Sequence, residues 1–196
     1  MFRWLRRLYD WVLHWAETPY AVPALIILAV AESSFFPVPA DVLLIALAVS
    51  IPRRSFEYAA YTSLFSVLGG VGGYVIGLKF MALVGSPIIE LYGYQAQFES
   101  LSGIFHRYNF IAVLTAAMTP IPYKVFTITA GAVEADFVEF VVASAVGRSL
   151  RFFAVGALIY FLGERVKEFI EKYFNILAVA FATLLLGGFV VVKLVF

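Results

Sequence analysis

The 196-residue chain has no cysteine, which excludes structural disulfides, thiol nucleophiles and cysteine-based metal sites. Histidine occurs only at His14 and His106, and each is best explained as an isolated aromatic residue at a membrane interface. Motifs of metalloproteases and serine hydrolases are also missing. An intramembrane aspartyl protease would need two aspartates at membrane depth, whereas only Asp41 qualifies. We therefore expect no metal, no cofactor and no enzymatic activity.

Charge is scarce as well. Charged residues make up 14% of the chain and the net charge is +1 at pH 7, which gives no reason to expect a nucleic acid partner. Hydrophobic residues reach 63%, more than a soluble domain of this size carries, so the composition predicts an integral membrane protein. Residues 1–20 carry arginines and tryptophans without an uninterrupted apolar core, which predicts an interfacial amphipathic helix and not a removable signal peptide.

A Pro-x-Pro motif occurs twice, each time inside an apolar stretch. The first copy reads Phe-Pro-Val-Pro-Ala-Asp over residues 36–41, and the second reads Thr-Pro-Ile-Pro-Tyr-Lys over residues 119–124. Each proline removes a backbone N–H and clashes with the preceding helical turn, so neither stretch can cross a bilayer as one regular helix. Broken helices at membrane depth usually line a cavity. The motifs predict an internal duplication with three pairs of equivalent residues: Pro37 and Pro120, Pro39 and Pro122, Asp41 and Lys124.

The first apolar stretch, residues 21–51, has basic residues at both ends, which favours a re-entrant hairpin on the cytoplasmic side. Residues 58–80 have the length of about 20 residues that a membrane span needs. The second broken stretch, residues 108–133, ends at Gly131 before an acidic turn that we place outside. One crossing between two like hairpins makes them inverted copies, related by an axis in the membrane plane.

A further span is expected over residues 140–162, and a charged linker with a C-terminal transmembrane helix over residues 164–196. The predicted fold class is an all-α integral membrane protein. Its membrane domain, residues 21–163, is expected to be an inverted repeat of interfacial helix, re-entrant broken hairpin and transmembrane helix. Three glycines one turn apart give the first span a face without side chains, against which another helix can pack: Gly69, Gly73 and Gly77.

Five ionisable residues lie at predicted membrane depth: Glu32, Asp41, Lys124, Arg148 and Arg151. Each costs roughly 2.5–3.5 kcal/mol at a helix centre, so these residues must pair or line water. Arg148 and Arg151 are three residues apart and share one helix face. Two interpretations stay open. The residues form internal salt bridges that hold the hairpins together, or the surplus cation and the planar arginine forks bind a phosphate group.

The two carboxylates have a separate predicted role. Apolar surroundings disfavour a charged carboxylate, whereas a nearby arginine favours it. Glu32 or Asp41 can therefore gain a proton when a substrate claims its partner, and lose that proton afterwards. We expect these two acids to couple transport to protons.

Three segments carry a recognisable pattern. They are residues 32–41, with an acid before Pro-x-Pro, residues 118–131, with the second motif, and residues 147–152, with both arginines. Together they resemble the DedA family of bacterial and archaeal membrane proteins, which is related to eukaryotic VTT-domain lipid scramblases. The resemblance covers residues 21–163. It implies two opposed re-entrant hairpins and movement of lipids, notably polyprenyl (undecaprenyl) phosphate or phospholipids, in some members with the proton gradient.

By this resemblance Glu32 and Asp41 look like the essential membrane acids of the family. The second hairpin departs from the family pattern, in which arginines commonly flank the proline motif, because Ala117 and Lys124 stand in those regions. Arg148 or Arg151 is expected to supply the missing charge.

The predicted function is a flippase or scramblase that moves a phosphate-bearing lipid across the cell membrane of a prokaryote. The lipid tail is expected to leave sideways beside the helix that carries Gly69, Gly73 and Gly77. Protons and a second copy of the chain are further candidate partners. Two alternatives stay open: an ion or small-solute transporter built on the same hairpins, and a noncatalytic membrane-organising protein.

Overall fold

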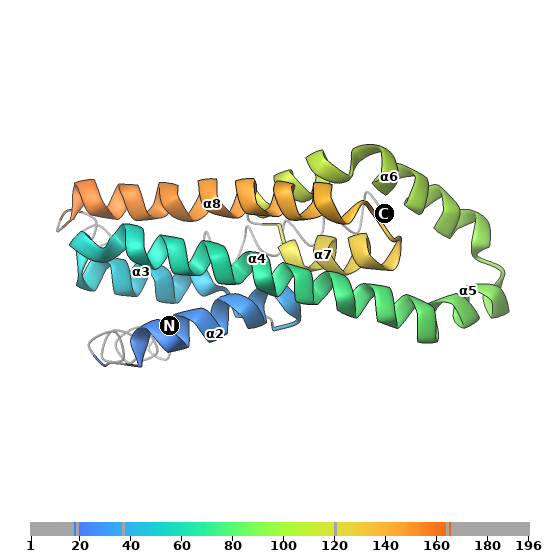
Figure 1. The fold of residues 1–196 in the computed structure, drawn as a ribbon, viewed down its shortest axis with the longest axis horizontal. Helices are drawn as coiled ribbons and strands as arrows, with labels where there is room; N and C mark the ends of the chain where they lie inside the picture. Colours follow the sequence, from blue (N-terminus) through green and yellow to red (C-terminus); the bar gives the residue numbers. More distant parts are fainter. Residues whose placement is uncertain (1–17, 19, 37, 120, 164, 166–196) are drawn as a thin grey trace, which may run out of the picture.

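The computed structural model describes residues 18, 20–36, 38–119, 121–163 and 165, and every regular element in these ranges is a helix (Figure 1). The prediction of an all-α fold is confirmed for this part of the chain. The expected interfacial helix of residues 1–20 and the C-terminal segment 164–196 fall almost entirely outside the described residues, as do Pro37 and Pro120.

The first broken stretch forms two helices, α2 over Ala21–Ser34 and α3 over Ala40–Ser50. α2 ends just before the Pro-x-Pro because a proline disfavours helical backbone in the residue that precedes it. Pro39 has extended backbone, with φ −68° and ψ 131°, and stands directly before the first turn of α3. The two helices run in opposite directions, so this stretch is a helical hairpin (Figure 1).

A short 3₁₀ turn, Pro52–Arg54, joins the hairpin to the long helix α4, Ser55–Phe80. The helical path continues through a π-helical turn, Met81–Gly85, into α5, Ser86–Tyr92. Gly93 then ends α5 in the left-handed conformation, with φ 69°, which glycine adopts without a steric penalty.

The second broken stretch also forms two helices. α6, Gln95–Met118, is bent at Tyr108, whose backbone is not helical. It stops at the second Pro-x-Pro, and α7, Tyr123–Ala132, begins directly after Pro122. The bend at Tyr108 falls where the sequence predicted the second broken stretch to begin.

The last long helix of the described chain, α8, spans Phe137–Leu162. It starts at Asp136, whose side chain accepts a hydrogen bond from the backbone N–H of Glu139. α4 and α8 lie side by side in opposite directions along the length of the molecule (Figure 1). α2 and α3 pack on one half of this pair and α7 packs on the other, so the two chain breaks face each other near the middle.

Two stretches of the described chain are long and apolar enough to cross a membrane: Pro52–Tyr92 and Phe137–Leu162. Only 28% of the most apolar window in each stretch is buried, so most of its side chains face outward. An extensive apolar surface that faces outward suits contact with lipid and not with water. The described part of the chain therefore has the surface expected of an integral membrane protein.

The glycine face of α4 receives both hairpins. A Cβ atom placed on Gly69 would stand 2.3 Å from the carbonyl oxygen of Val30 in α2. A Cβ atom on Gly77 would stand 1.9 Å from the carbonyl oxygen of Ile128 in α7. Gly73 lies between these two positions and contacts both hairpins. The three glycines thus let two backbones approach a third closely.

Gly131 of α7 completes this packing, because a Cβ atom there would stand 1.9 Å from the carbonyl oxygen of Tyr74 in α4. Hairpin backbone therefore fills the space beside the glycine face. The lateral exit of a lipid tail beside this helix stays a prediction, and the glycine positions themselves are occupied by the hairpins.

Replacing Gly77 by alanine is expected to destabilise the protein by about 1–3 kcal/mol, because the added methyl group meets backbone that cannot rotate away. Gly103 in α6 is the matched control, since nothing lies within 4 Å of a Cβ atom placed there. Gly103→Ala should be neutral or stabilising by up to about 1 kcal/mol, because alanine favours helix. Thermal unfolding of the detergent-purified variants measures both effects, and equal losses would contradict the packing described above.

Candidate functional site

The two chain breaks place three ionisable residues at helix ends near the middle of the molecule. Glu32 lies in the last turn of α2, Asp41 in the first turn of α3 and Lys124 in the first turn of α7. Arg148 and Arg151 lie in the middle of α8 and face these breaks. Residues far apart in the sequence thus meet in one site.

Arg148 is the centre of this site and is only 1% exposed. Its Nη2 atom donates to Oε2 of Glu32 at 2.6 Å and to Oγ of Ser33 at 3.1 Å. Its Nε atom donates to Oγ of Ser66 in α4, and the two serine hydroxyls are 2.6 Å apart. The buried cation therefore has a counter-charge and further hydrogen-bond acceptors, which burial of a guanidinium group requires.

Aromatic rings also contact the Arg148 guanidinium. Its central carbon lies 4.7 Å from the ring centre of Tyr123 in α7 and 4.7 Å from that of Phe152 in α8. A guanidinium group over an aromatic face is attracted by the ring, and more strongly where water is excluded. The second hairpin thereby contributes to the environment of the ion pair that the first hairpin makes with α8.

Arg151 makes the second ion pair. Its Nη2 lies 2.8 Å from Oδ2 of Asp41 and its Nε lies 3.2 Å from Oδ1, so the arginine fork meets the carboxylate with two hydrogen bonds. Its Nη1 donates to the carbonyl oxygen of Thr119, the residue before the second Pro-x-Pro. A carbonyl at a helix end lacks an intrahelical partner, so Arg151 satisfies it and ties both hairpins to α8.

Lys124 bridges the two chain breaks. Its Nζ donates to the carbonyl oxygen of Phe36 at 2.9 Å, directly before the first Pro-x-Pro. Thr127, one turn further along α7, donates to the carbonyl oxygen of Ser33 at 3.3 Å. Among the described residues Lys124 has no ion pair with a carboxylate. It is therefore the surplus cation of the site.

The structure thus brings the five predicted residues together, but in a particular pairing. Glu32 pairs with Arg148 and Asp41 with Arg151, so carboxylates occupy both arginine forks. A phosphate clamp that uses both arginines together with Lys124 is not assembled in this state. In this structure both arginines form internal salt bridges, and Lys124 donates to a backbone carbonyl without a carboxylate partner among the described residues.

The sequence interpretation missed three residues of the site. Ser33 follows Glu32 directly and Tyr123 precedes Lys124 directly, so their positions beside ionisable residues were a usable signal. Ser66 is a polar residue of an apolar span, three residues before Gly69 on the packed face of α4. A small hydroxyl in such a position is common between packed helices, and nothing in the sequence indicated that it meets an arginine.

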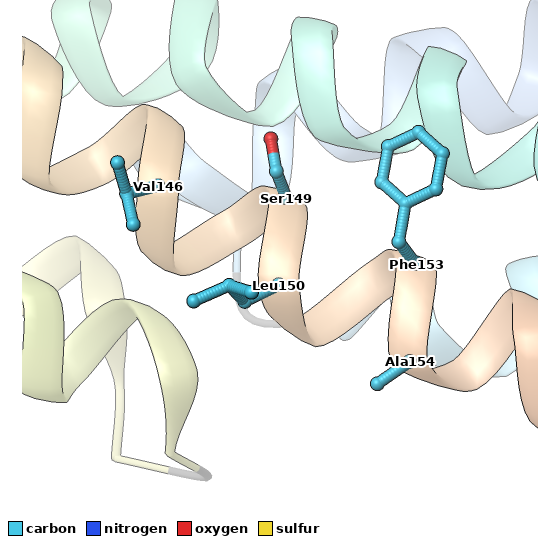
Figure 2. A pocket seen from close by; sticks show the side chains of 5 residues that line it. All are labelled: Val146, Ser149, Leu150, Phe153 and Ala154. Atoms are coloured by element: carbon cyan, nitrogen blue, oxygen red, sulfur yellow. The ribbon is translucent and has the colours of Figure 1, made fainter.

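A shallow apolar hollow of about 540 Å³ lies along α8, the helix that carries both arginines. Its lining residues are shown in Figure 2: Val146, Ser149, Leu150, Phe153 and Ala154. Ser149 and Phe153 point toward α4, where the Ser149 hydroxyl is hydrogen-bonded to Ser63 at 2.8 Å (Figure 2). The hollow therefore presents an apolar surface.

Within the described ranges no group of three or more histidine, cysteine or acidic side chains is arranged to hold a metal ion. The residues of the site instead form hydrogen bonds and ion pairs with one another.

Comparison with known proteins identifies the family. A family model of the VTT domain matches residues 38–161, well over half of the chain. The chain belongs to the DedA family. The matched segment begins inside the first Pro-x-Pro and ends at the penultimate residue of α8, so it includes all the site residues described above except Glu32, Ser33 and Phe36.

Two relatives of this DedA protein are similar over most of their length. An "Uncharacterized protein" of Haemophilus influenzae is 33% identical over 186 residues, which cover 95% of this chain and 96% of the relative. The "Uncharacterized protein HI0703 homolog" of Histophilus somni is 30% identical over 158 residues, which cover 81% and 82%. No solved structure matches the chain.

Proposed function

We propose that this DedA protein moves a phosphate-bearing lipid, such as polyprenyl (undecaprenyl) phosphate or a phospholipid, across the cell membrane of a prokaryote. It acts as a flippase or scramblase and not as an enzyme. The observation that carries the proposal is the pair of carboxylate–arginine contacts at the point where two broken hairpins meet. Ionisable residues at membrane depth are expensive and generally mark a transport path.

The hairpins are proposed to be re-entrant and to form an inverted repeat. Residues 21–50 and residues 95–132 each fold as helix, Pro-x-Pro break and helix, and their breaks meet through Lys124 and Phe36. Two hairpins that enter from opposite faces would meet in this way near the bilayer midplane, where transporters with inverted repeats place their substrates.

This topology predicts the sidedness of four exposed positions. Cysteines at residues 20 and 51, the two ends of the first hairpin, should react with a membrane-impermeant maleimide from the same side. Cysteines at residues 94 and 134, beside the second hairpin, should react from the opposite side. The absence of native cysteine makes each single variant unambiguous. Labelling of residues 20 and 51 from opposite sides would show that residues 21–50 cross the membrane completely.

In the proposed transport cycle, each carboxylate alternates between an ion pair with its arginine and a protonated, neutral form. A phosphate that approaches an arginine competes with the carboxylate that occupies its fork. Protonation removes the charge of Glu32 or Asp41, which frees the guanidinium for the anion, and loss of the proton restores the ion pair. The lipid headgroup would first meet Lys124, while its tail would lie in the apolar hollow along α8.

Reconstitution in liposomes tests the function directly. Transfer of a phosphorylated lipid should exceed transfer of its dephosphorylated counterpart, and an imposed pH gradient should change the rate. Equal transfer of both lipids would show that the protein does not recognise the phosphate group. No transfer of either lipid, with transfer of a small ion or solute, would favour the alternative of a small-solute transporter. No transfer of any kind would favour a membrane-organising role.

Replacing Lys124 by glutamine is expected to slow transfer of the phosphorylated lipid by about tenfold, because loss of one charge-assisted contact costs about 1.4 kcal/mol or more. Transfer of the dephosphorylated lipid should change little. Lys79→Gln is the control, since Lys79 is an exposed lysine in the last turn of α4. A similar loss for both lipids in Lys124→Gln would indicate that Lys124 only holds the hairpins together.

A further inference from the structure

One face of α8 carries an apolar stripe that no element of the described chain covers. Its side chains recur every three or four residues, so they line one side of the helix. Each of the large ones is between 37% and 77% exposed: Val142, Val146, Leu150, Phe153 and Phe161. The stripe includes the apolar hollow, where Leu150 and Ala154 point away from α4 (Figure 2).

The other sides of α8 are occupied. α4 and α6 pack along it, and α3 also contacts it. The approach is close, since a Cβ atom on Gly147 would stand 2.6 Å from Cβ of Ala117 in α6. A Cβ atom on Gly156 would stand 3.0 Å from the carbonyl oxygen of Ser55 in α4. A further helix can therefore reach α8 only at the stripe.

The sequence that follows α8 supplies such a helix. Residues 174–192 contain no charged residue, and this length is close to the roughly 20 residues that a membrane span needs. The linker of residues 163–173 joins them to the end of α8. A span that starts where α8 ends crosses the membrane in the opposite direction, and consecutive helices are usually neighbours in space.

We propose that residues 174–196 dock on the stripe as a helix antiparallel to α8. The middle of α8 lies between Ser149 and Leu150, and the middle of residues 174–196 is Leu185. Two antiparallel spans at the same depth bring these middles together. Gly187 and Gly188, two to three residues further on, then lie level with the part of α8 between Val146 and Leu150.

The glycine pair fits the hollow at this level. Residues 174–196 contain no other glycine, so this is the place where their backbone can be approached most closely. Val146 and Leu150 are bulky, exposed side chains that need such a surface opposite them. Association of helices in a membrane depends on van der Waals packing, and a helix with a matching surface packs more closely than mobile lipid tails.

The docking deepens the proposed function, and this step rests on that function. The lipid tail is proposed to lie in the same hollow, which five residues of α8 line. The hollow takes one apolar occupant at a time, so the C-terminal helix and the tail compete for it. The helix therefore controls access: the tail enters when the helix moves aside, and the helix returns when the lipid leaves.

The chain has no native cysteine, so pairs of introduced cysteines test the docking directly. Leu150→Cys is combined with one further cysteine at each position from 183 to 191 in turn, in variants that keep the Tm of the wild-type protein. Oxidation should join the pair within one chain at residue 187 or 188, and again one turn away, with little crosslinking in between. Labelling of the remaining thiols with a bulky maleimide measures the crosslinked fraction on a denaturing gel.

Leu68→Cys, with the same second cysteines, is the matched control. Leu68 is exposed on α4, five residues after Ser63, whose hydroxyl meets that of Ser149 in α8. Five residues turn a helix through about 140°, so Leu68 faces away from α8. Equal crosslinking from residues 68 and 150 would overturn the docking. Crosslinks between two chains would overturn it in favour of a second copy on the stripe, and no crosslink at any position would overturn it in favour of lipid.

The control of lipid access is tested with the same variants in proteoliposomes. The crosslinked form should lose lipid transfer because its helix cannot leave the hollow, and reduction with dithiothreitol should restore transfer. The reduced form of each variant is thus its own control. Full transfer by the crosslinked form would overturn the competition and leave the docking standing. If the wild-type protein transfers no lipid, the proposed function fails, and the crosslinks still decide the docking.

Discussion

Replacing Glu32 by glutamine is expected to abolish proton-coupled lipid transfer while the protein still folds. The amide keeps the shape of the side chain and an oxygen that can accept from Arg148, which lies 2.6 Å away. It cannot take up or release a proton, and it leaves the buried guanidinium without a counter-charge. Removing one partner of a buried ion pair typically costs about 3–5 kcal/mol, and the retained hydrogen bond should keep the loss toward the lower end.

A double variant separates transport from stability. Glu32→Gln with Arg148→Gln removes both charges and should recover much of the lost stability, because no unpaired charge stays buried. Lipid transfer should stay absent in the double variant if Glu32 carries the proton. Recovery of transfer together with stability would show that the pair is only a structural contact. The measurements are thermal unfolding in detergent and lipid transfer in liposomes across a range of pH.

The chain contains its own control for an ion pair. Arg54 and Glu57 are also 2.6 Å apart, but their side chains are 46% and 40% exposed. Pairs in contact with water contribute little to stability, because water screens the charges and the long side chains lose conformational freedom. Glu57→Gln should therefore change neither stability nor transfer measurably, although the distance equals that in the Glu32–Arg148 pair. A comparable loss in both variants would indicate a general effect of charge and not a buried site.

Much of the helical framework followed from local rules. The two Pro-x-Pro motifs interrupt helices because proline lacks a backbone N–H, and α3 and α7 begin directly after Pro39 and Pro122. The glycine row of α4 predicted a close approach of helices, which is where both hairpins pack. Such rules depend on a few neighbouring residues, so the sequence can carry them without knowledge of the fold.

The pairing of charges did not follow from local rules. The sequence placed two acids and three bases at membrane depth, but several pairings were equally consistent with it. Glu32 meets Arg148 and not Arg151 because the packing of α2 and α3 against the long helices sets where each acid lies along the axis of α8. These positions depend on contacts between segments more than 100 residues apart, which local patterns do not encode. The same reason explains why Ser66 and Tyr123 were missed.

The residues that follow the two Pro-x-Pro motifs carry opposite charges. Asp41 and Lys124 each stand two residues after the second proline of a Pro-x-Pro motif, yet Asp41 forms an ion pair with Arg151 while Lys124 meets only a backbone carbonyl among the described residues. Both side chains lie at the first turn of a helix that follows a Pro-x-Pro. The first hairpin therefore supplies a carboxylate that is paired with α8, and the second supplies a cation without a carboxylate partner among the described residues.

Replacing Arg148 by lysine is expected to impair both stability and lipid transfer although the charge is kept. The guanidinium donates from Nε and Nη2 to three oxygens and lies over two aromatic rings. An ammonium group is a compact point charge that cannot reproduce this planar arrangement, so part of the network loses its donor. We expect a loss of about 2–4 kcal/mol in the free energy of unfolding, since the site is buried.

Arg151→Lys is the control with which the Arg148→Lys variant is compared. Arg151 has 18% of its side chain exposed, and its partners are one carboxylate and one carbonyl. A lysine can reach one of them and leave the other to water, so the loss of stability should be clearly smaller than for Arg148→Lys. If both forks engage the same lipid phosphate during transport, Arg151→Lys should still reduce transfer of the phosphorylated lipid selectively. Unchanged transfer after both substitutions would leave the arginines as structural ion-pair partners, because a phosphate that binds two forks must distinguish guanidinium from ammonium.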